Sequence, residues 1–362
     1  MEKNALLEYF LTREKTYLFI LRADDEKPNV IEINKGLDFW KNARKHFFNN
    51  LELFGSRKGF EREVKGFYAL GKHLIEPALK FLDNIERLYI VPHKELHHLP
   101  FHAMHISMHN KIFHLIEIFQ VIYLPSATIL KFCQRKNPYR KHKVYINTPL
   151  ILGAWAKDDS ERYQQAVQLE LDTLSNIFNS PAIDQLNASK QQFLNEASQA
   201  DLLHLSCHGF FLNSADTMAS SGLLLNDGKV FPEKPNKENI LETLDKRSFL
   251  SAKELLNVQL NCHIVTLSAC ETGKSENISG DELIGLSRAL LYAGTPSILL
   301  TLWSVNVESK LQLMKYFYNY WQSNMQNGKS KALQKAQIEL LNSDKFNSLY
   351  HWGAYILIGD WI

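Results

Sequence analysis

The chain has 362 residues, of which 45% are apolar and 22% charged, a composition that is ordinary for a globular protein of one or two domains. The formal net charge of +2 is too small to attract nucleic acid or an anionic membrane, so we expect neither as a partner. Four cysteines are too few for a disulfide framework, and no secretory signal or apolar run of about 20 residues is present. A soluble cytoplasmic protein is the expectation.

The first 140 residues predict a small α/β unit. Its expected elements, in chain order, are a hairpin over 15–35, helices over 37–53 and 59–82, strands over 87–91 and 113–123, and a helix over 126–134. No candidate nucleophile stands in this region. We therefore interpret residues 1–140 as a non-catalytic domain.

Histidines are concentrated between positions 93 and 114. They are His93, His97, His98, His102, His105, His109 and His114. Imidazole binds zinc and copper, but the segment has no cysteine, one carboxylate, and spacings that match no standard zinc pattern. We expect polar-packed or solvated histidines, with no metal and no cofactor.

A basic segment, Arg135–Lys143, separates this unit from the rest of the chain. With few aromatic residues in it, an inter-domain linker is favoured over a nucleic-acid patch. The second half, residues 141–362, alternates strands and helices. The expected strands cover 144–147, 201–206, 263–268, 297–303 and 354–358, and the helices 162–178, 251–257, 281–292, 308–325 and 331–341. This order predicts an α/β sandwich with a mostly parallel sheet.

Two predicted strands end in residues that carry chemistry. One ends at His208 and Gly209, and the other at Cys270. Because chemistry gathers at the carboxyl ends of parallel strands, this places an imidazole base beside a thiol. The backbone N–H groups of Gly209 and Cys270 would form an oxyanion hole. Side chains alternate along a strand, so Cys207 should point away from His208.

The motifs around these residues resemble those of the CHAT proteases, relatives of caspases and separase. The motifs are His204–Gly209 and Ser268–Gly273, with further matches at 90–103, 280–283, 293–294, 302–305, 332–337 and 352–359. The resemblance implies a caspase-like catalytic half preceded by a pseudo-caspase-like half. It also implies a cysteine endopeptidase with a Cys270–His208 dyad and a protein substrate. Bacterial relatives act in antiviral defence, for instance on gasdermin-like pore formers, so an activating protein or upstream sensor is an expected partner.

Two further residues are candidates for binding substrate. By the family resemblance, Asp281 lies at the rim of the cleft, although capping the helix that follows it is the simpler reading. Trp303 either walls the pocket or packs in the core. Relatives carry an acidic residue after the Leu-Trp-x-Val motif, where this chain has Asn306 and Val307.

Three questions stay open at the level of sequence. The polar stretch 226–250 is either a surface insertion or an activation segment. The fold could serve as a catalytically silent scaffold, and a Cys–His pair also suits an acyltransferase.

Overall fold

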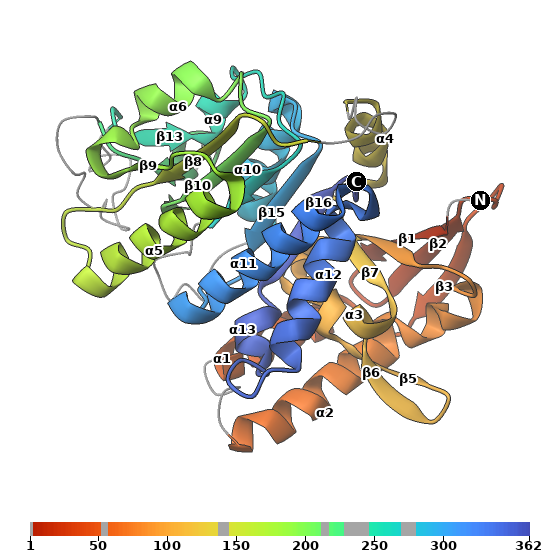
Figure 1. Cartoon of the computed structure of the whole chain (residues 1–362). Helices are drawn as coiled ribbons and strands as arrows, with labels where there is room; N and C mark the ends of the chain where they lie inside the picture. Colours follow the sequence, from red (N-terminus) through yellow and green to blue (C-terminus); the bar gives the residue numbers. More distant parts are fainter. Residues whose placement is uncertain (1–2, 52–56, 137–144, 211–216, 228–245, 269–279) are drawn as a thin grey trace.

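The computed structural model describes residues 3–51, 57–136, 145–210, 217–227, 246–268 and 280–362, and within them eleven strands form one sheet (Figure 1). Their spatial order is β3 (Asn29–Ile33), β2 (Thr16–Arg22), β1 (Asn4–Leu11), β4 (Arg87–Val91), β7 (Gln120–Tyr123), β16 (Tyr355–Gly359), β15 (Ser297–Thr301), β14 (Val265–Leu267), β10 (Leu202–Ser206), β8 (Pro149–Gly153) and β9 (Ile183–Asp184). Neighbouring strands are parallel except within β1–β2–β3 and between β15 and β16. The predicted α/β fold with a mostly parallel sheet is confirmed.

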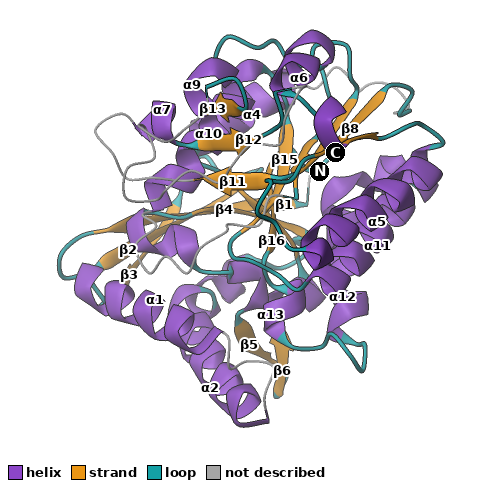
Figure 2. Cartoon of the chain, turned by 90° about the vertical axis from the view of Figure 1, so that its left-hand side faces the viewer, coloured by secondary structure: helices purple, strands orange, loops and turns teal. Residues whose placement is uncertain are grey.

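Helices cover both faces of this sheet. Those described are α1 (Leu37–Leu51), α2 (Arg57–Leu74), α3 (Leu115–Ile118), α4 (Ala127–Lys136), α5 (Glu161–Phe178), α6 (Lys190–Glu196), α7 (Thr217–Ser220), α9 (Ala252–Leu255), α10 (Gly280–Ala293), α11 (Val307–Ser323), α12 (Gly328–Leu341) and α13 (Leu349–Trp352). Figure 2 shows α5, α11 and α12 together on one side of the central strands, with α10 on the other. Because both faces are covered, β10, β14 and β16 are buried along their whole length.

Two smaller sheets accompany the large one. The first consists of the antiparallel strands β11 (His208–Phe210), β12 (Gly222–Leu224) and β13 (Phe249–Ser251). The second is a hairpin of β5 (His105–Met108) and β6 (Lys111–His114). The three-stranded sheet begins at His208, so it extends directly from the end of β10.

The large sheet contains strands from both sides of the predicted boundary at residue 140. Strand β16, near the end of the sequence, lies between β7 of the first half and β15 of the second. Residues of both halves also share one hydrophobic core. The division into a non-catalytic half, 1–140, and a catalytic half, 141–362, stays a prediction, and most of the predicted linker lies outside the described residues.

One strand was missed and two local predictions were wrong. Strand β1 was not predicted, although its alternation buries Ala5, Leu7, Tyr9 and Leu11. The strand expected over 113–123 is broken by the turn of helix α3, where the Glu117 carboxylate accepts a hydrogen bond from the His114 amide at 2.7 Å. The strand expected over 144–147 forms instead at 149–153. A proline can begin a strand there because the first residue needs no ladder donor.

Four buried histidines make the stability of the fold sensitive to acid. Burial lowers the pKa of His98, His102, His105 and His263 to about 3, against 6.5 for an ordinary histidine. At a pH between the folded and the unfolded pKa, the unfolded chain binds more protons than the folded one. The free energy of unfolding therefore falls as the pH drops below about 6.5. At pH 5.5 each histidine should lower the free energy of unfolding by roughly 1 kcal/mol relative to pH 7.5.

Urea unfolding at pH 7.5 and pH 5.5 measures this loss. A His105→Leu variant should lose a smaller amount over the same interval, because one of the four groups no longer titrates. Equal unfolding free energies at the two pH values would contradict the assignment of these histidines as buried and neutral.

Candidate active site

The carboxyl ends of β8, β10 and β14 lie next to one another, because these strands are parallel neighbours. His208 follows the end of β10 and is almost wholly buried. Cys270, the predicted nucleophile, lies in 269–279, outside the described residues, and Ser268 is the last described residue before it. The sheet thus places β10, whose end is followed by His208, beside the strand that leads to Cys270, while the dyad itself stays a prediction.

The His208 ring is held by a carboxylate and an aromatic ring. Its Nε2 lies 2.7 Å from Oδ2 of Asp159, and the two side chains are 1% and 3% exposed. The Tyr163 ring stacks on the imidazole at 4.6 Å between centroids and 10° between planes. The two contacts fix both the position and the plane of the ring.

Asp159 is itself fixed by the loop that joins β8 to α5. The amide of Ala156 donates to Asp159 Oδ2 at 2.6 Å, and the next residue, Ser160, is the N-cap of α5. Tyr163 is in the first turn of that helix, and its amide donates to the Ser160 hydroxyl. The beginning of helix α5 and the residue before its N-cap therefore position Tyr163 and Asp159, the two residues that contact the His208 ring.

The sequence prediction missed Asp159. It placed the strand at 144–147, five residues early, so the loop behind the true strand was not recognised as part of the site. A signal was present, because Asp159 and Ser160 stand just before a helix at the point where a parallel strand has ended.

The Asp159 contact decides which nitrogen of His208 can act as a base. A carboxylate accepts hydrogen bonds, so the Nε2 facing Asp159 carries the proton. In the neutral ring, Nδ1 is then the unprotonated nitrogen, and it is buried without a hydrogen-bond partner in the described part of the chain. A nitrogen in this state can take a proton from a thiol.

Strand β11, which contains His208 and Gly209, takes part in a small hydrophobic cluster through Phe210. Ala156, Phe210, Leu224 and Phe249 form a separate hydrophobic cluster that links the Asp159 loop to the three-stranded sheet. Gly209 is buried in β11 opposite Leu223. The oxyanion role of the Gly209 and Cys270 amides stays a prediction.

Cys207, next to His208 in sequence, has the properties of a core residue. Its side chain is fully buried, and burial raises the pKa of its thiol to about 12. The same effect raises the pKa of Cys133 to about 12 and that of Cys262 to about 11. Each of these thiols is protonated at neutral pH, which makes each a poor nucleophile.

The two proposed substrate-binding residues have different surroundings. Helix α10 begins at Gly280, so Asp281 lies inside its first turn, and its side chain is outside the described part. Trp303 is buried, its Nε1 donates to the Tyr350 carbonyl at 3.1 Å, and its ring packs on Phe47 of α1. These contacts are those of a core residue, and a role of Trp303 in the pocket stays a prediction.

Asn306, which stands where relatives have an acid, caps helix α11. Its Oδ1 accepts hydrogen bonds from the amides of Glu308 and Ser309 at 2.9 and 3.4 Å. Asn is among the residues that cap helices best, so Asn306 has a structural function at this position.

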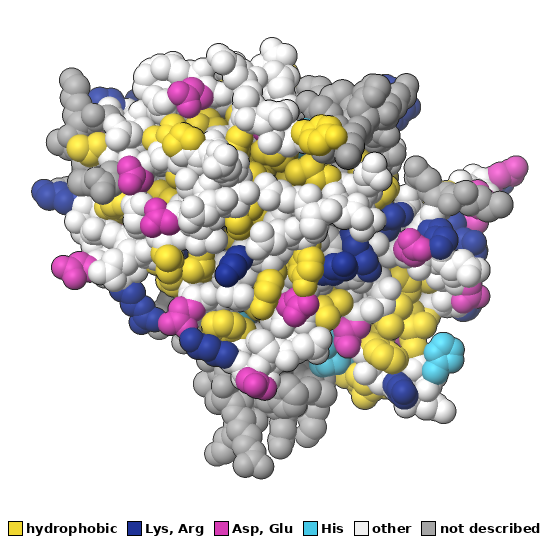
Figure 3. All heavy atoms as spheres, viewed as in Figure 1, with side chains coloured by type: hydrophobic (Ala, Val, Ile, Leu, Met, Phe, Trp, Pro, Cys, Tyr) yellow, Lys and Arg dark blue, Asp and Glu magenta, His cyan; other side chains and the backbone are white. Residues whose placement is uncertain are grey.

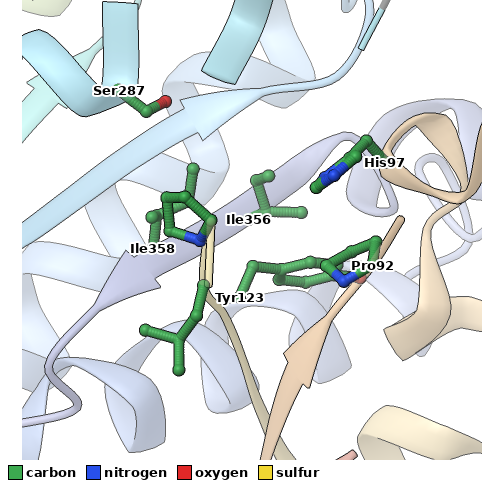
Figure 4. A pocket seen from close by; sticks show the side chains of 8 residues that line it. Pro92, His97, Tyr123, Ser287, Ile356 and Ile358 are labelled. Carbon is green, nitrogen blue, oxygen red and sulfur yellow. The ribbon is translucent and has the colours of Figure 1, made fainter. Parts of the chain in front are cut away.

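A cavity of about 30 Å³ lies between the two halves (Figure 4). Pro92, His97, Tyr123, Ser287, Ile356 and Ile358 contribute to its lining. A cavity of this volume holds one or two water molecules and is too small for the side chain of a peptide substrate. We therefore do not assign substrate binding to it.

Three properties bear on other functions. No three histidine, cysteine or acidic side chains in the described part come together as a metal site. No described helix has the length and apolar character needed to span a membrane. On the face drawn in Figure 3, basic and acidic side chains are interspersed among the described residues.

The fold, a large and mostly parallel sheet between helices, is similar to the caspase-like α/β fold. Yeast separase, in the Saccharomyces cerevisiae separase–securin complex, superposes with a TM-score of 0.59 at 9% identity, over 99% of this chain and 30% of separase. The model of the CHAT domain matches residues 67–360. The chain therefore belongs to the CHAT domain family, a relationship that supports a cysteine peptidase.

Two relatives share detectable sequence similarity. Tetratricopeptide repeat protein 28 from Homo sapiens and its counterpart from Mus musculus are each 25% identical over 307 residues. The match covers 76% of this chain and 12% of each relative, so the chain spans about an eighth of their length.

Proposed function

We propose that this chain is a cysteine endopeptidase in which Cys270 is the nucleophile, His208 the base, and Asp159 the residue that orients His208. The observation that carries the proposal is the buried His208–Asp159 pair at the end of β10, beside the strand that leads to Cys270. Membership of the CHAT family supports it.

The proposed reaction runs in two steps. His208 Nδ1 takes the proton of the Cys270 thiol, and the sulfur attacks the carbonyl carbon of the scissile peptide bond. The amides of Gly209 and Cys270 stabilise the oxyanion. His208 then returns the proton to the leaving amine as the C–N bond breaks, and water hydrolyses the thioester to regenerate the thiol.

The substrate that we propose is a specific folded or partly folded protein, with a gasdermin-like pore former as one candidate. An activating protein or upstream sensor, a cytoplasmic location and a role in antiviral defence complete the proposal. These parts rest on the family resemblance.

One experiment distinguishes the peptidase from two other functions, an acyltransferase and a catalytically silent scaffold. Incubation with a peptide library, followed by mass spectrometry of the products beside a Cys270→Ala control, should give cleavage at defined positions. Transfer of an acyl group to an added amine without net hydrolysis would favour an acyltransferase. If neither cleavage nor transfer is detected although Cys270 still reacts with iodoacetamide, a catalytically silent scaffold would be favoured.

The specificity of this enzyme should separate the two readings of Asp281. If its carboxylate faces the cleft, a basic residue before the scissile bond is preferred, and Asp281→Asn should lower that preference about tenfold through loss of a charge-assisted hydrogen bond. If Asp281 only stabilises the start of α10, Asn should keep the preference at a stability cost below about 1 kcal/mol. Cleavage profiles of wild type and variant decide between them.

A further inference from the structure

A single buried carboxylate contacts the ends of two neighbouring strands. Glu170 of α5 is fully buried, its Oε2 accepts from the Ser206 hydroxyl at 2.7 Å, and its Oε1 accepts from the Ser268 hydroxyl at 2.6 Å. Ser206 is the last residue of β10, and Ser268 directly follows β14. The two strands are parallel neighbours, so Glu170 spans the seam between their carboxyl ends.

A lysine from the next helix balances this charge. Lys310 of α11 places Nζ 2.8 Å from Glu170 Oε2, and 3.4 Å from both the Ser206 hydroxyl and the Ser268 carbonyl. Burial would raise the pKa of Glu170, but the Lys310 ammonium and the contact with the His204 ring outweigh it and hold that pKa below its ordinary value. Figures 1 and 2 show α5 and α11 side by side on the same face of the sheet.

The two serines stand at equivalent places relative to the proposed dyad. His208 comes two residues after Ser206, and Cys270 comes two residues after Ser268. We propose that Glu170 is a positioning residue: by bonding both serines, it sets the separation of the strand ends that lead to His208 and to Cys270. This inference rests on the proposed function, because it concerns the geometry of the same pair.

Stability alone does not account for the arrangement. A buried ion pair is often no more stabilising than apolar side chains of the same volume, because both charges lose their hydration. The Glu170 carboxylate instead accepts directional hydrogen bonds from two neighbouring strands at corresponding positions near their carboxyl ends. A nucleophile and its base must be held within about half an ångström of their working geometry, and such bonds supply that precision.

The test removes the two bonds to the strands and leaves the Glu170–Lys310 pair in place. The variant is Ser206→Ala/Ser268→Ala. The matched control is Ser330→Ala, which deletes another buried serine hydroxyl, the one that donates to Gln120 Oε1 at 2.6 Å and joins α12 to β7. Each substitution deletes a buried serine hydroxyl, two in the test variant and one in the control, so a general loss of stability should appear in both and be larger in the double variant.

Two readouts are compared. The first is the rate of alkylation of Cys270 by iodoacetamide at pH 6 to 8, followed on the Cys270 peptide, which requires no substrate. The second is hydrogen exchange of the Ser268 amide, which donates to the Leu205 carbonyl at 2.9 Å across the same seam. In the double variant, we expect alkylation at pH 6 to slow about tenfold and exchange to accelerate, with Ser330→Ala within about twofold of wild type.

Unchanged alkylation together with unchanged exchange in the double variant would overturn the inference, as would equal effects in Ser330→Ala. The failure of the proposed function has a different signature. In that case His208→Ala leaves the alkylation profile of Cys270 as it is in wild type. The exchange of the Ser268 amide then decides alone whether Glu170 holds the two strand ends.

Discussion

Replacing either member of the dyad should abolish peptide cleavage. Cys270→Ala removes the nucleophile, and His208→Ala removes the base that generates the thiolate, so each should lower turnover by at least about a thousandfold. The fold should persist in His208→Ala, because Asp159 keeps its hydrogen bond from the Ala156 amide. Turnover of a peptide from the library profile, measured beside the thermal unfolding midpoint, checks both statements.

Cys207→Ala is the matched control for this experiment. Its thiol is adjacent to His208 in sequence but buried, with a pKa raised to about 12, so its loss should leave turnover within about threefold of wild type. If Cys207→Ala is as inactive as Cys270→Ala while still folded, the nucleophile has been assigned to the wrong cysteine. Wild-type cleavage by His208→Ala would remove the base from the mechanism.

Asp159→Asn should lower kcat by about 10² to 10⁴-fold with little change in KM. The side-chain amide keeps the size of the carboxylate, and its oxygen can still accept from the Ala156 amide and from Nε2–H, but it has no negative charge to stabilise the imidazolium that forms when Nδ1 takes the thiol proton. The remaining activity should depend on pH differently from wild type, because Asp159 no longer stabilises the imidazolium.

The neighbouring residue provides the control for this substitution. Asp158 is exposed, so Asp158→Asn makes the same change in charge one position away and should retain wild-type kcat and pH dependence. Equal kinetics for Asp159→Asn and wild type would show that Tyr163 and the packing around β11 suffice to orient His208. Equal losses in both variants would point to an effect of net charge.

The sequence predicted the larger elements of the fold because they leave periodic or continuous apolar patterns. Strand β10 and helix α5 were placed to within a residue or two, since one is a short apolar run and the other an amphipathic repeat with a serine cap. His208 was a candidate because it follows such a run. These are local signals, readable from neighbours in the chain.

What the sequence did not predict depends on contacts between distant segments. Asp159 approaches His208 across 49 positions, and Glu170 reaches Ser268 across 98. Nothing in a local pattern distinguishes Glu170 from an exposed glutamate on the helix surface. Its burial follows only when α5 lies against β8, where Gly153 leaves room for the Leu171 side chain.

The position of β16 in the sheet has a consequence for synthesis on the ribosome. Residues 355–359 lie between β7 and β15, so a nascent chain that has emerged only as far as residue 350 holds two partial sheets with unpaired edges. Such edges attract other strands, which makes this interval the one most exposed to misassembly or to chaperone capture. The eleven-stranded sheet therefore becomes continuous only after residues 355–359 have been made, although most of its strands precede them in the sequence.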